Sequence, residues 1–331
     1  MRFGPVPLDQ AEGAILAHSQ DLGGRRLRKG RVLGAADVAA LAAAGRAEVI
    51  VARLDPGDMG EDAAATRLAA ALVPDPGAAH LRLTRASTGR VNLYATGPGV
   101  LGLDAARLDA ANRVDPMVTV ATLPPLARVT AGTMVATVKI IAYGVAETSV
   151  EAAADRARDA MRVHPVCLRG AALIQTDIGD GPGKGEDAMR ARLAALGMTL
   201  DHVETVPHRA DTLAGAIAAA PGDLVLILTA SATSDPDDVA PSAVRAAGGS
   251  VARFGMPVDP GNLLFLGEQG GRPVIGLPGC ARSPALNGAD WVLERVACGL
   301  EVTDADIAGM GVGGLLKESP ARGMPRVDAA G

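Results

Sequence analysis

Two short turn-forming units in the C-terminal half of the chain have the residue types of an anion-binding site, namely Pro260-Gly261-Asn262 and Pro278-Gly279-Cys280. Proline fixes φ and glycine permits positive φ, so each Pro-Gly step predicts a tight turn with exposed backbone amides. Between them the sequence predicts a strand, a glycine-rich hairpin (Gly267 to Arg272) and a second strand. Arg282 and Ser283 then add a planar cation and a hydroxyl. Two such turns at the ends of neighbouring strands would flank one anionic ligand; the alternative is two ordinary loops.

A second candidate segment follows the apolar run Leu224–Leu228, which is typical of a central parallel strand. Small and hydroxyl residues let a ligand approach the backbone there, and the helix that follows would point its amide-rich N-terminus at a phosphate. The acidic cluster adds unfavourable negative charge. Asp235 and Asp237 are equally well explained as helix caps, whereas Asp238 would hold a metal ion or an NH group of the ligand. The predicted binding residues of this loop are Thr229, Ala230, Ser231, Ala232, Thr233 and Ser234.

A third loop follows the predicted strand Cys167 to Gln175 and falls at the same edge of the sheet. It begins with Thr176 and Asp177 and contains four alternating glycines, which predict an open loop, with Lys184 as a phosphate-seeking cation. A solvated glycine-rich turn is the alternative. The loop lacks the GK[ST] of a phosphate-binding P-loop, and there is no GxGxxG at the first strand–helix turn, which argues against a dinucleotide site.

Other chemistries find little support in the sequence. The three cysteines, Cys167, Cys280 and Cys298, are too widely spaced for a disulfide framework or a metal cluster. His202 and His208 lack the spacing of a zinc site. There is no GxSxG motif for a nucleophilic serine. Cys280 is either an activated thiol or a bystander.

The composition indicates a globular protein. Of the 331 residues, 48% are apolar but only 2% aromatic, so the cores must be built from Ala, Val, Leu and Ile. The Ala/Gly/Arg bias indicates a GC-rich bacterial genome. A net charge of −5 argues against nucleic acid as a partner. We find neither a membrane-spanning apolar run nor a signal peptide, and so expect no membrane contact and a cytoplasmic location.

The order of predicted elements divides the chain into four parts. Residues 1–78 and 79–165 are expected to be two small α+β domains, and 301–331 a C-terminal tail. Over 166–300, predicted strands and helices alternate, which predicts a doubly wound α/β domain with a mostly parallel sheet. Ligands in such sheets bind beyond the carboxyl ends of the strands, which is where the three candidate loops fall.

Several of these segments resemble those of a known family. A Leu-Val-Leu-Ile-Leu-Thr strand, a small-residue loop ending in Asp238, a Pro-Gly turn at 260–261 and Gly276-Leu277-Pro278-Gly279 resemble the molybdopterin-binding domain of molybdenum-cofactor biosynthesis proteins. This domain occurs in molybdopterin molybdotransferases, in molybdopterin adenylyltransferases and in gephyrin. The segment Val258–Leu300 is similar to a bacterial subgroup sometimes fused to a cofactor nucleotidyltransferase. The resemblance covers 166–300 well and 1–75 loosely, and it implies a three-layer α/β/α fold.

The family's motifs map onto this chain with departures. Its Thr-Gly-Gly-x-Ser-x-Gly-x-x-Asp loop falls on Thr229 to Asp238 with three glycines replaced, and its Pro-Gly-Lys-Pro turn begins at Pro260 with Asn262 in place of lysine. Its Thr-Gly-Asp-Glu segment falls on Thr176 to Gly179 with one acidic position lost. Its Gly-Leu-Pro-Gly-Asn-Pro-x-Ser segment falls on Gly276, Leu277, Pro278, Gly279, Cys280, Ala281, Arg282 and Ser283. These departures favour pterin binding over retained molybdate-insertion chemistry.

The resemblance therefore implies that the protein binds molybdopterin or the molybdenum cofactor. The phosphate would lie among Thr229 to Ser234, Gly279, Arg282 and Lys184. Asp238 would be the catalytic group, orienting the pterin or holding Mg²⁺ or molybdate. If the chain is an enzyme, it would transfer molybdate or a nucleotide to or from the dithiolene.

Two alternatives to this function stay open. One is a non-catalytic carrier for a molybdoenzyme, and the other is a nucleotide- or sugar-phosphate-binding α/β protein. Besides the pterin, the expected partners are a molybdoenzyme, a cofactor nucleotidyltransferase or a second copy of the chain.

Overall fold

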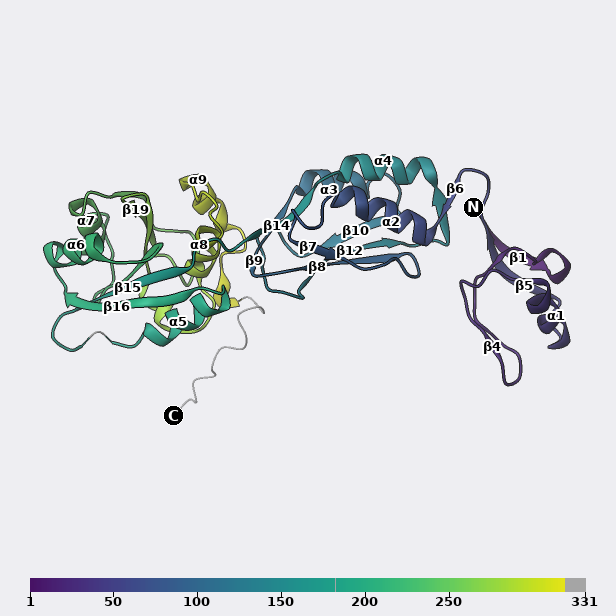
Figure 1. Cartoon of the computed structure of the whole chain (residues 1–331), viewed down its shortest axis with the longest axis horizontal. Coiled ribbons are helices and arrows are strands. Elements are labelled where there is room, and N and C mark those ends of the chain that lie inside the picture. Colours follow the sequence, from purple (N-terminus) through teal and green to yellow (C-terminus); the bar gives the residue numbers. More distant parts are fainter. Residues whose placement is uncertain (182, 319–331) are drawn as a thin grey trace. The chain divides into compact units, whose positions relative to one another are not determined.

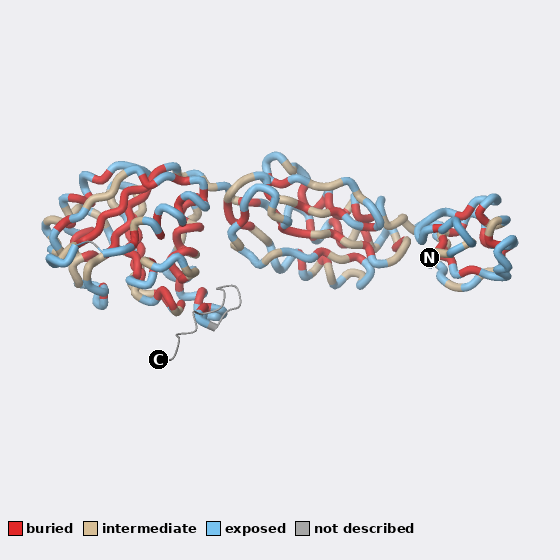
Figure 2. The backbone as a smooth tube through the Cα atoms, turned by 90° about the horizontal axis from the view of Figure 1, so that it is seen from below, coloured by how far each residue is buried: buried red, intermediate tan, exposed pale blue. Residues whose placement is uncertain are grey.

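The computed structural model describes residues 1–181 and 183–318, which form two compact units. The N-terminal unit comprises Met1–Gly97 and Leu101–His164, and the C-terminal unit comprises Pro98–Val100 and the chain from Pro165 onward. Figure 1 labels the helices and strands of the chain, and each unit has its own buried apolar residues, with buried positions drawn in red in Figure 2. Within the described part of the chain, no helix is long and apolar enough to cross a membrane.

The first part of the N-terminal unit is a small antiparallel sheet, in the order β1-β5-β2, with one helix. Alternating residues of β5, Val49 and Val51, are buried together with Leu41 of the helix, so the sheet has one apolar face. The elements are β1 (Arg2–Pro7), β2 (Ile15–Leu16), β3 (Gln20–Asp21), β4 (Arg26–Leu27), α1 (Ala35–Ala43) and β5 (Glu48–Arg53).

The remainder of the N-terminal unit is an α+β core. Helices α2, α3 and α4 cover one face of the antiparallel sheet β10-β12-β8-β7 (Figure 1). The elements are β6 (Asp58–Gly60), α2 (Glu61–Leu72), β7 (Leu81–Leu83), β8 (Arg90–Ala95), β9 (Gly99–Leu103), α3 (Ala105–Asn112), β10 (Val118–Thr122), β11 (Arg128–Val129), β12 (Met134–Ile140), β13 (Gly144–Ala146), α4 (Glu147–Ala157) and β14 (Met161–Pro165).

Helix α2 lies before the domain boundary that the sequence predicts after residue 78. Its residues Ala64, Leu68 and Leu72 are fully buried in the same core as Leu93 of β8 and Val150 of α4. The helix therefore packs with the elements that follow it in the sequence.

The C-terminal unit is built on a six-stranded sheet in the order β16-β15-β17-β20-β19-β18. The strands β16, β15, β17 and β20 are parallel, while β19 and β18 run antiparallel to their neighbours. The predicted mostly parallel α/β sheet is confirmed. Its elements are β15 (Gly170–Asp177), α5 (Glu186–Ala195), β16 (Thr199–Pro207), α6 (Ala210–Ala219), β17 (Leu224–Leu228), α7 (Val239–Ala246), β18 (Ser250–Phe254), β19 (Phe265–Gln269), β20 (Arg272–Gly276), α8 (Gly288–Ala297) and α9 (Asp304–Ala308).

Helices cover both faces of this sheet. Because side chains alternate along a strand, Leu226 of β17 packs toward α5 and α8, whereas Ile227 packs toward α6 and α7. Both residues are fully buried, as expected for a central strand with helices on each side. The three-layer α/β/α arrangement follows from these two separate apolar cores.

The segment after residue 300, which the sequence analysis treats as a tail, partly packs on the C-terminal unit. Ile307 of α9, Met310 and Leu316 are buried in the core formed with α5 and α8. The segment also pairs with the loop before β19, since the amide of Asp259 donates to Gly314 and the amide of Leu316 donates to Asp259. Residues 319–331 of the predicted tail lie outside the described residues.

Gly215 offers a simple test of α6. It lies in the middle of the helix, is exposed, and a Cβ built on it would meet nothing within 4 Å. We expect Gly215→Ala to raise the free energy of unfolding by roughly 0.5–1 kcal/mol, because alanine loses less backbone entropy on folding. Chemical denaturation of the variant and the parent protein measures this difference. A destabilised variant would contradict the exposed mid-helix position.

Candidate functional site

Five segments meet at one edge of the six-stranded sheet. The parallel strands β15, β16, β17 and β20 all end there. Because β19 is antiparallel to β20, with Phe265 opposite Gly276, the segment that precedes β19 lies at the same edge. The sheet therefore places both Pro-Gly units beside the two loops that the sequence analysis singled out, at the edge where doubly wound sheets bind ligands.

The first Pro-Gly unit is fastened to the start of α8. The Asp259–Pro260 peptide is cis, and the carbonyl of Pro260 accepts the amide of Gly288 at 2.8 Å. Gly261 has φ of 143°, and a Cβ there would lie 2.8 Å from the nitrogen of Gly288. Only glycine fits this close approach. Pro260 and Gly261 are buried, so among the three predicted residues Asn262 is the one exposed to a ligand.

The second Pro-Gly unit forms a short 3₁₀ turn over Gly279–Arg282. Pro278 is buried at the end of β20, whereas Gly279, Cys280 and Ser283 are exposed. A Cβ on Gly279 would meet nothing within 4 Å, so the backbone here is open to an approaching group. The exposed face of this turn lies at the sheet edge.

Arg192 of α5 fixes this turn through hydrogen bonds, and no local sequence pattern pointed to it. Its guanidinium donates to the carbonyls of Ala281 (2.9 Å), Ser283 (2.9 Å) and Ala285 (3.0 Å). Its Nε donates to Asp290 of α8 at 2.5 Å, and the side chains of this ion pair are only 9% and 11% exposed. Such an arginine is a structural group, because its donors are directed at the backbone of the turn.

Arg282 links three loops. One Nη donates to the carbonyl of Lys184 at 2.8 Å, and the other donates to the carbonyl of Thr229 at 2.9 Å. Burial lowers the pKa of the Arg282 guanidinium below its ordinary value. A Cβ on Gly183 would lie 3.3 Å from Nη1, so the arginine also lies against the glycine-rich loop. The guanidinium therefore joins the loops after β15 and β17 to the turn after β20. Lys184 itself is exposed.

The loop after β17 is organised by its own side chains. The hydroxyls of Thr229 and Thr233 are 3.2 Å apart, and Thr233 is buried. Ser231, Ala232 and Ser234 are exposed, whereas Ala230 is half-buried. These exposed positions are the part of the loop that a ligand can reach.

Asp238 caps helix α7. Its carboxylate accepts the amide of Val239 at 2.7 Å and the amide of Ser234 at 3.1 Å. In the same loop, the carboxylate of Asp235 accepts the amide of Asp237 at 2.8 Å. These bonds give Asp238 a structural role that accounts for its place in the loop.

A metal at Asp238 is not supported by the surrounding donors. Over residues 1–181 and 183–318, no group of three or more His, Cys, Asp or Glu side chains gathers in a way that could hold an ion. Mg²⁺ is usually bound by one or two carboxylates together with waters and substrate phosphates, so ion binding by Asp238 stays a prediction.

The end of β15 brings together two residues that the sequence analysis did not connect. Thr176 is fully buried, and its hydroxyl accepts the amide of Ala230 at 2.8 Å. The same hydroxyl lies 2.8 Å from Nδ1 of His208, the residue directly after β16. The next residue of β15, Asp177, accepts the amides of Gly179 and Gly181, each at 2.9 Å. Thr176 thus bridges the β17 loop and His208.

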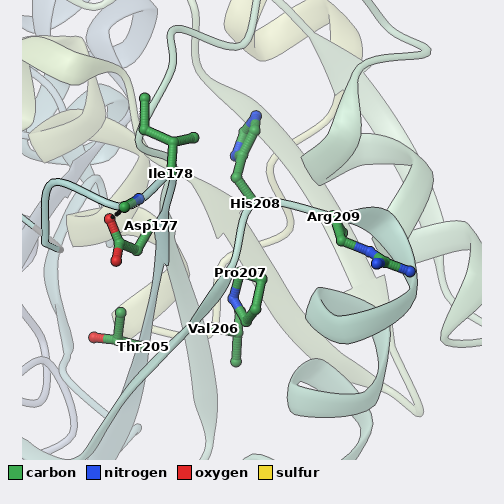
Figure 3. Close-up of a pocket in the computed structure, with 8 residues that line it drawn as sticks. Asp177, Ile178, Thr205, Val206, Pro207, His208 and Arg209 are labelled. Atoms are coloured by element: carbon green, nitrogen blue, oxygen red, sulfur yellow. Dashed lines mark hydrogen bonds between the residues drawn. The ribbon is translucent and has the colours of Figure 1, made fainter.

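A hollow of about 520 Å³ opens beside His208 (Figure 3). It lies where β15 and β16 end, and Asp177 is the one member of the predicted binding set that lines it. Its lining residues are Asp177, Ile178, Gly179, Thr205, Val206, Pro207, His208 and Arg209. The sequence holds a signal for this hollow, since His208 and Arg209 directly follow β16, a strand of the parallel sheet.

Comparison with known proteins agrees with this architecture. Residues 178–296 match the model of a probable molybdopterin binding domain, and residues 5–53 match that of a domain of unknown function. No curated protein matches the chain.

Two solved structures with similar chains are both molybdenum-cofactor proteins. A molybdopterin biosynthesis MoeA protein from Pyrococcus horikosii is 14% identical, with 91% of this chain and 76% of that one covered and a TM-score of 0.31. A molybdenum cofactor biosynthesis protein from Pyrococcus furiosus is 13% identical, with 93% and 65% covered and a TM-score of 0.23. Scores this low support no further argument, so the assignment rests on the family model. The part of the chain that is similar to a probable molybdopterin binding domain is therefore residues 178–296.

Proposed function

We propose that the carboxyl edge of the C-terminal unit binds molybdopterin or the molybdenum cofactor, and that the protein acts in the biosynthesis or maturation of that cofactor. The observation that supports this most strongly is that the molybdopterin-binding family match, residues 178–296, includes all but the first two residues of the loops that converge at this edge.

The exposed groups at this edge suit the phosphate of a pterin ligand. Ser231 and Ser234 present hydroxyls, Gly279 presents an open backbone, and Lys184 adds a cation. Phosphate oxygens accept hydrogen bonds from such groups. Arg282 contributes by holding the three loops in place and by its charge.

Any reaction at this edge would depend on positioning and electrostatics. The transfer of molybdate or of a nucleotide to or from the pterin dithiolene needs no protein nucleophile if the two reactants are held together. A non-catalytic carrier that delivers the cofactor to a molybdoenzyme is the second candidate. It is favoured by Asn262, which stands where the family has a lysine, and by Asp238, whose carboxylate caps a helix.

The test uses the purified full-length chain. We expect it to release a fluorescent pterin on denaturation, or to bind added molybdopterin when the protein is isolated empty. Molybdate insertion in the presence of nucleotide then separates the two candidates, because turnover identifies a transferase and tight binding without turnover identifies a carrier. Absence of any pterin binding would overturn the proposed function.

Replacing Arg282 with alanine is expected to weaken pterin binding by about 1.5–3 kcal/mol, because a charge-assisted contact and the clamp on two carbonyls are lost together. Fluorescence titration measures the affinity. Arg190→Ala is the matched control, since Arg190 lies on α5 in an exposed pair with Glu186. Equal affinities of the two variants would remove Arg282 from the site.

A further inference from the structure

We propose that the hollow at the ends of β15 and β16 is a second subsite, in which His208 and Arg209 bind a phosphate oxyanion. The inference rests on the proposed function for the assignment of this edge to an anionic ligand. It extends that function to a part of the edge that lies outside the two Pro-Gly units and the β17 loop.

The hydrogen bonds of Thr176 determine which nitrogen of His208 faces a ligand. Thr176 is fully buried, and its oxygen already accepts the amide of Ala230. Its hydroxyl proton needs an acceptor, and Nδ1 of His208 lies 2.8 Å away. A neutral imidazole that accepts at Nδ1 has its proton on Nε2. Since His208 lines the hollow (Figure 3), this tautomer gives the hollow an N–H donor whose orientation depends on Thr176.

The hydrogen-bond donors around the hollow suit an anion with several acceptor oxygens. Arg209 pairs with Asp211 at 2.6 Å, and both side chains are more than 60% exposed. An exposed ion pair contributes little to stability, so the guanidinium can exchange this partner for a ligand at little cost. The Oδ1 atom of Asp177, which also lines the hollow, accepts the amides of Gly179 and Gly181. The hollow therefore offers donors from an imidazole, a guanidinium and the hydroxyl of Thr205.

Thr176 also connects this subsite to the neighbouring loop. Its hydroxyl contacts His208 on one side and the backbone of Ala230 on the other. A ligand that moves the imidazole must therefore shift a hydrogen bond of the β17 loop. The oxyanion in the hollow would be either the phosphate of the bound pterin itself or that of a separate molecule. Bound pterin would compete with added phosphate in the first case and would not compete with it in the second.

In the test, inorganic phosphate is titrated into the full-length protein. Calorimetry measures the affinity for phosphate, and NMR monitors the signals of the histidine side chains. We expect phosphate to shift the His208 signal, and His208→Gln and Arg209→Gln each to weaken phosphate binding roughly tenfold or more. His202→Gln is the matched control, because His202 lies on the same strand beside Glu204 and away from the hollow. It should leave phosphate affinity unchanged.

Thr176 variants test the orientation of the imidazole. Thr176→Val should weaken phosphate binding while Thr176→Ser restores it, and circular dichroism confirms that both are folded. Unchanged phosphate affinity in His208→Gln and Arg209→Gln, or no phosphate binding by the parent protein, would overturn the subsite.

Pterin affinity is measured on the same preparations, so failure of this inference and failure of the proposed function are distinguishable. If saturating pterin abolishes phosphate binding, the oxyanion is that of the pterin; if both bind together, a separate phosphate-bearing ligand occupies the hollow. Either result supports the subsite.

Discussion

Replacing Arg192 with methionine is expected to lower the free energy of unfolding of the C-terminal unit by about 3–5 kcal/mol. The variant leaves the carboxylate of Asp290 buried without its cation, and it leaves the carbonyls of Ala281, Ser283 and Ala285 without their donor. Removing one partner of a buried ion pair costs more than the pair itself contributes, because the remaining charge is desolvated and uncompensated.

Trp291 makes it possible to measure the free energy of unfolding of the C-terminal unit by itself. It is the single tryptophan of the chain and lies in α8, next to Asp290. Its fluorescence during urea denaturation reports the unfolding of the C-terminal unit separately from the N-terminal unit. Arg190→Met is the control on the same helix, with an expected change within about 0.5 kcal/mol. Equal stabilities of the two variants would show that Arg192 does not hold the turn.

A second large effect is expected at Gly276, the last residue of β20. A Cβ at this position would lie 1.9 Å from Cε1 and 2.1 Å from Cδ1 of Phe265, which is itself only 1% exposed. We expect Gly276→Ala to lower the free energy of unfolding by about 1–3 kcal/mol or more, because the ring has no space into which it can move without disturbing the core.

The same substitution should also weaken pterin binding. Phe265 is the first residue of β19 and directly follows the segment that contains Pro260 and Gly261. Displacement of its ring is therefore expected to move the first Pro-Gly unit. Gly279→Ala, where a Cβ meets nothing within 4 Å, is the control for stability. Recovery of stability in the double variant Gly276→Ala, Phe265→Leu would identify the clash as the cause, whereas an unchanged stability of Gly276→Ala would refute it.

The regular elements with a strong pattern were predictable. The apolar run Leu224–Leu228 forms a strand with those bounds, and residues 210–219, which lie where strands and helices were expected to alternate, form a helix. All five residues of the strand are buried, as expected for a central strand, and the buried residues of the helix, Leu213, Ala216 and Ile217, recur with helical spacing. Helix α4 was not predicted, because its buried residues after Val150 are the alanines 153, 154 and 157, whose apolar signal is weak in so alanine-rich a chain.

The candidate site was predictable in its loops but not in its contacts. The alternation of strands and helices was sufficient to place the loops after β15, β17 and β20 at one edge. The contacts of individual side chains could not be predicted. The carboxylate of Asp238 caps a helix, and the guanidinium of Arg282 donates to two carbonyls. Hydrogen bonds between residues far apart in the chain depend on strand order and register, which local sequence patterns do not specify.

By itself, the sequence determined that the C-terminal unit is an α/β domain and that its two Pro-Gly units are tight turns, because these features depend on local periodicity and on the restricted backbone of proline and glycine. Only the tertiary structure decided that Arg192 supports the second turn, and that Thr176 connects Ala230 to His208 beside a hollow. The residues in these contacts are separated by between 32 and 93 positions. The packing of helices on a sheet of defined order brings them together, and that order arises from burial of both faces of the sheet.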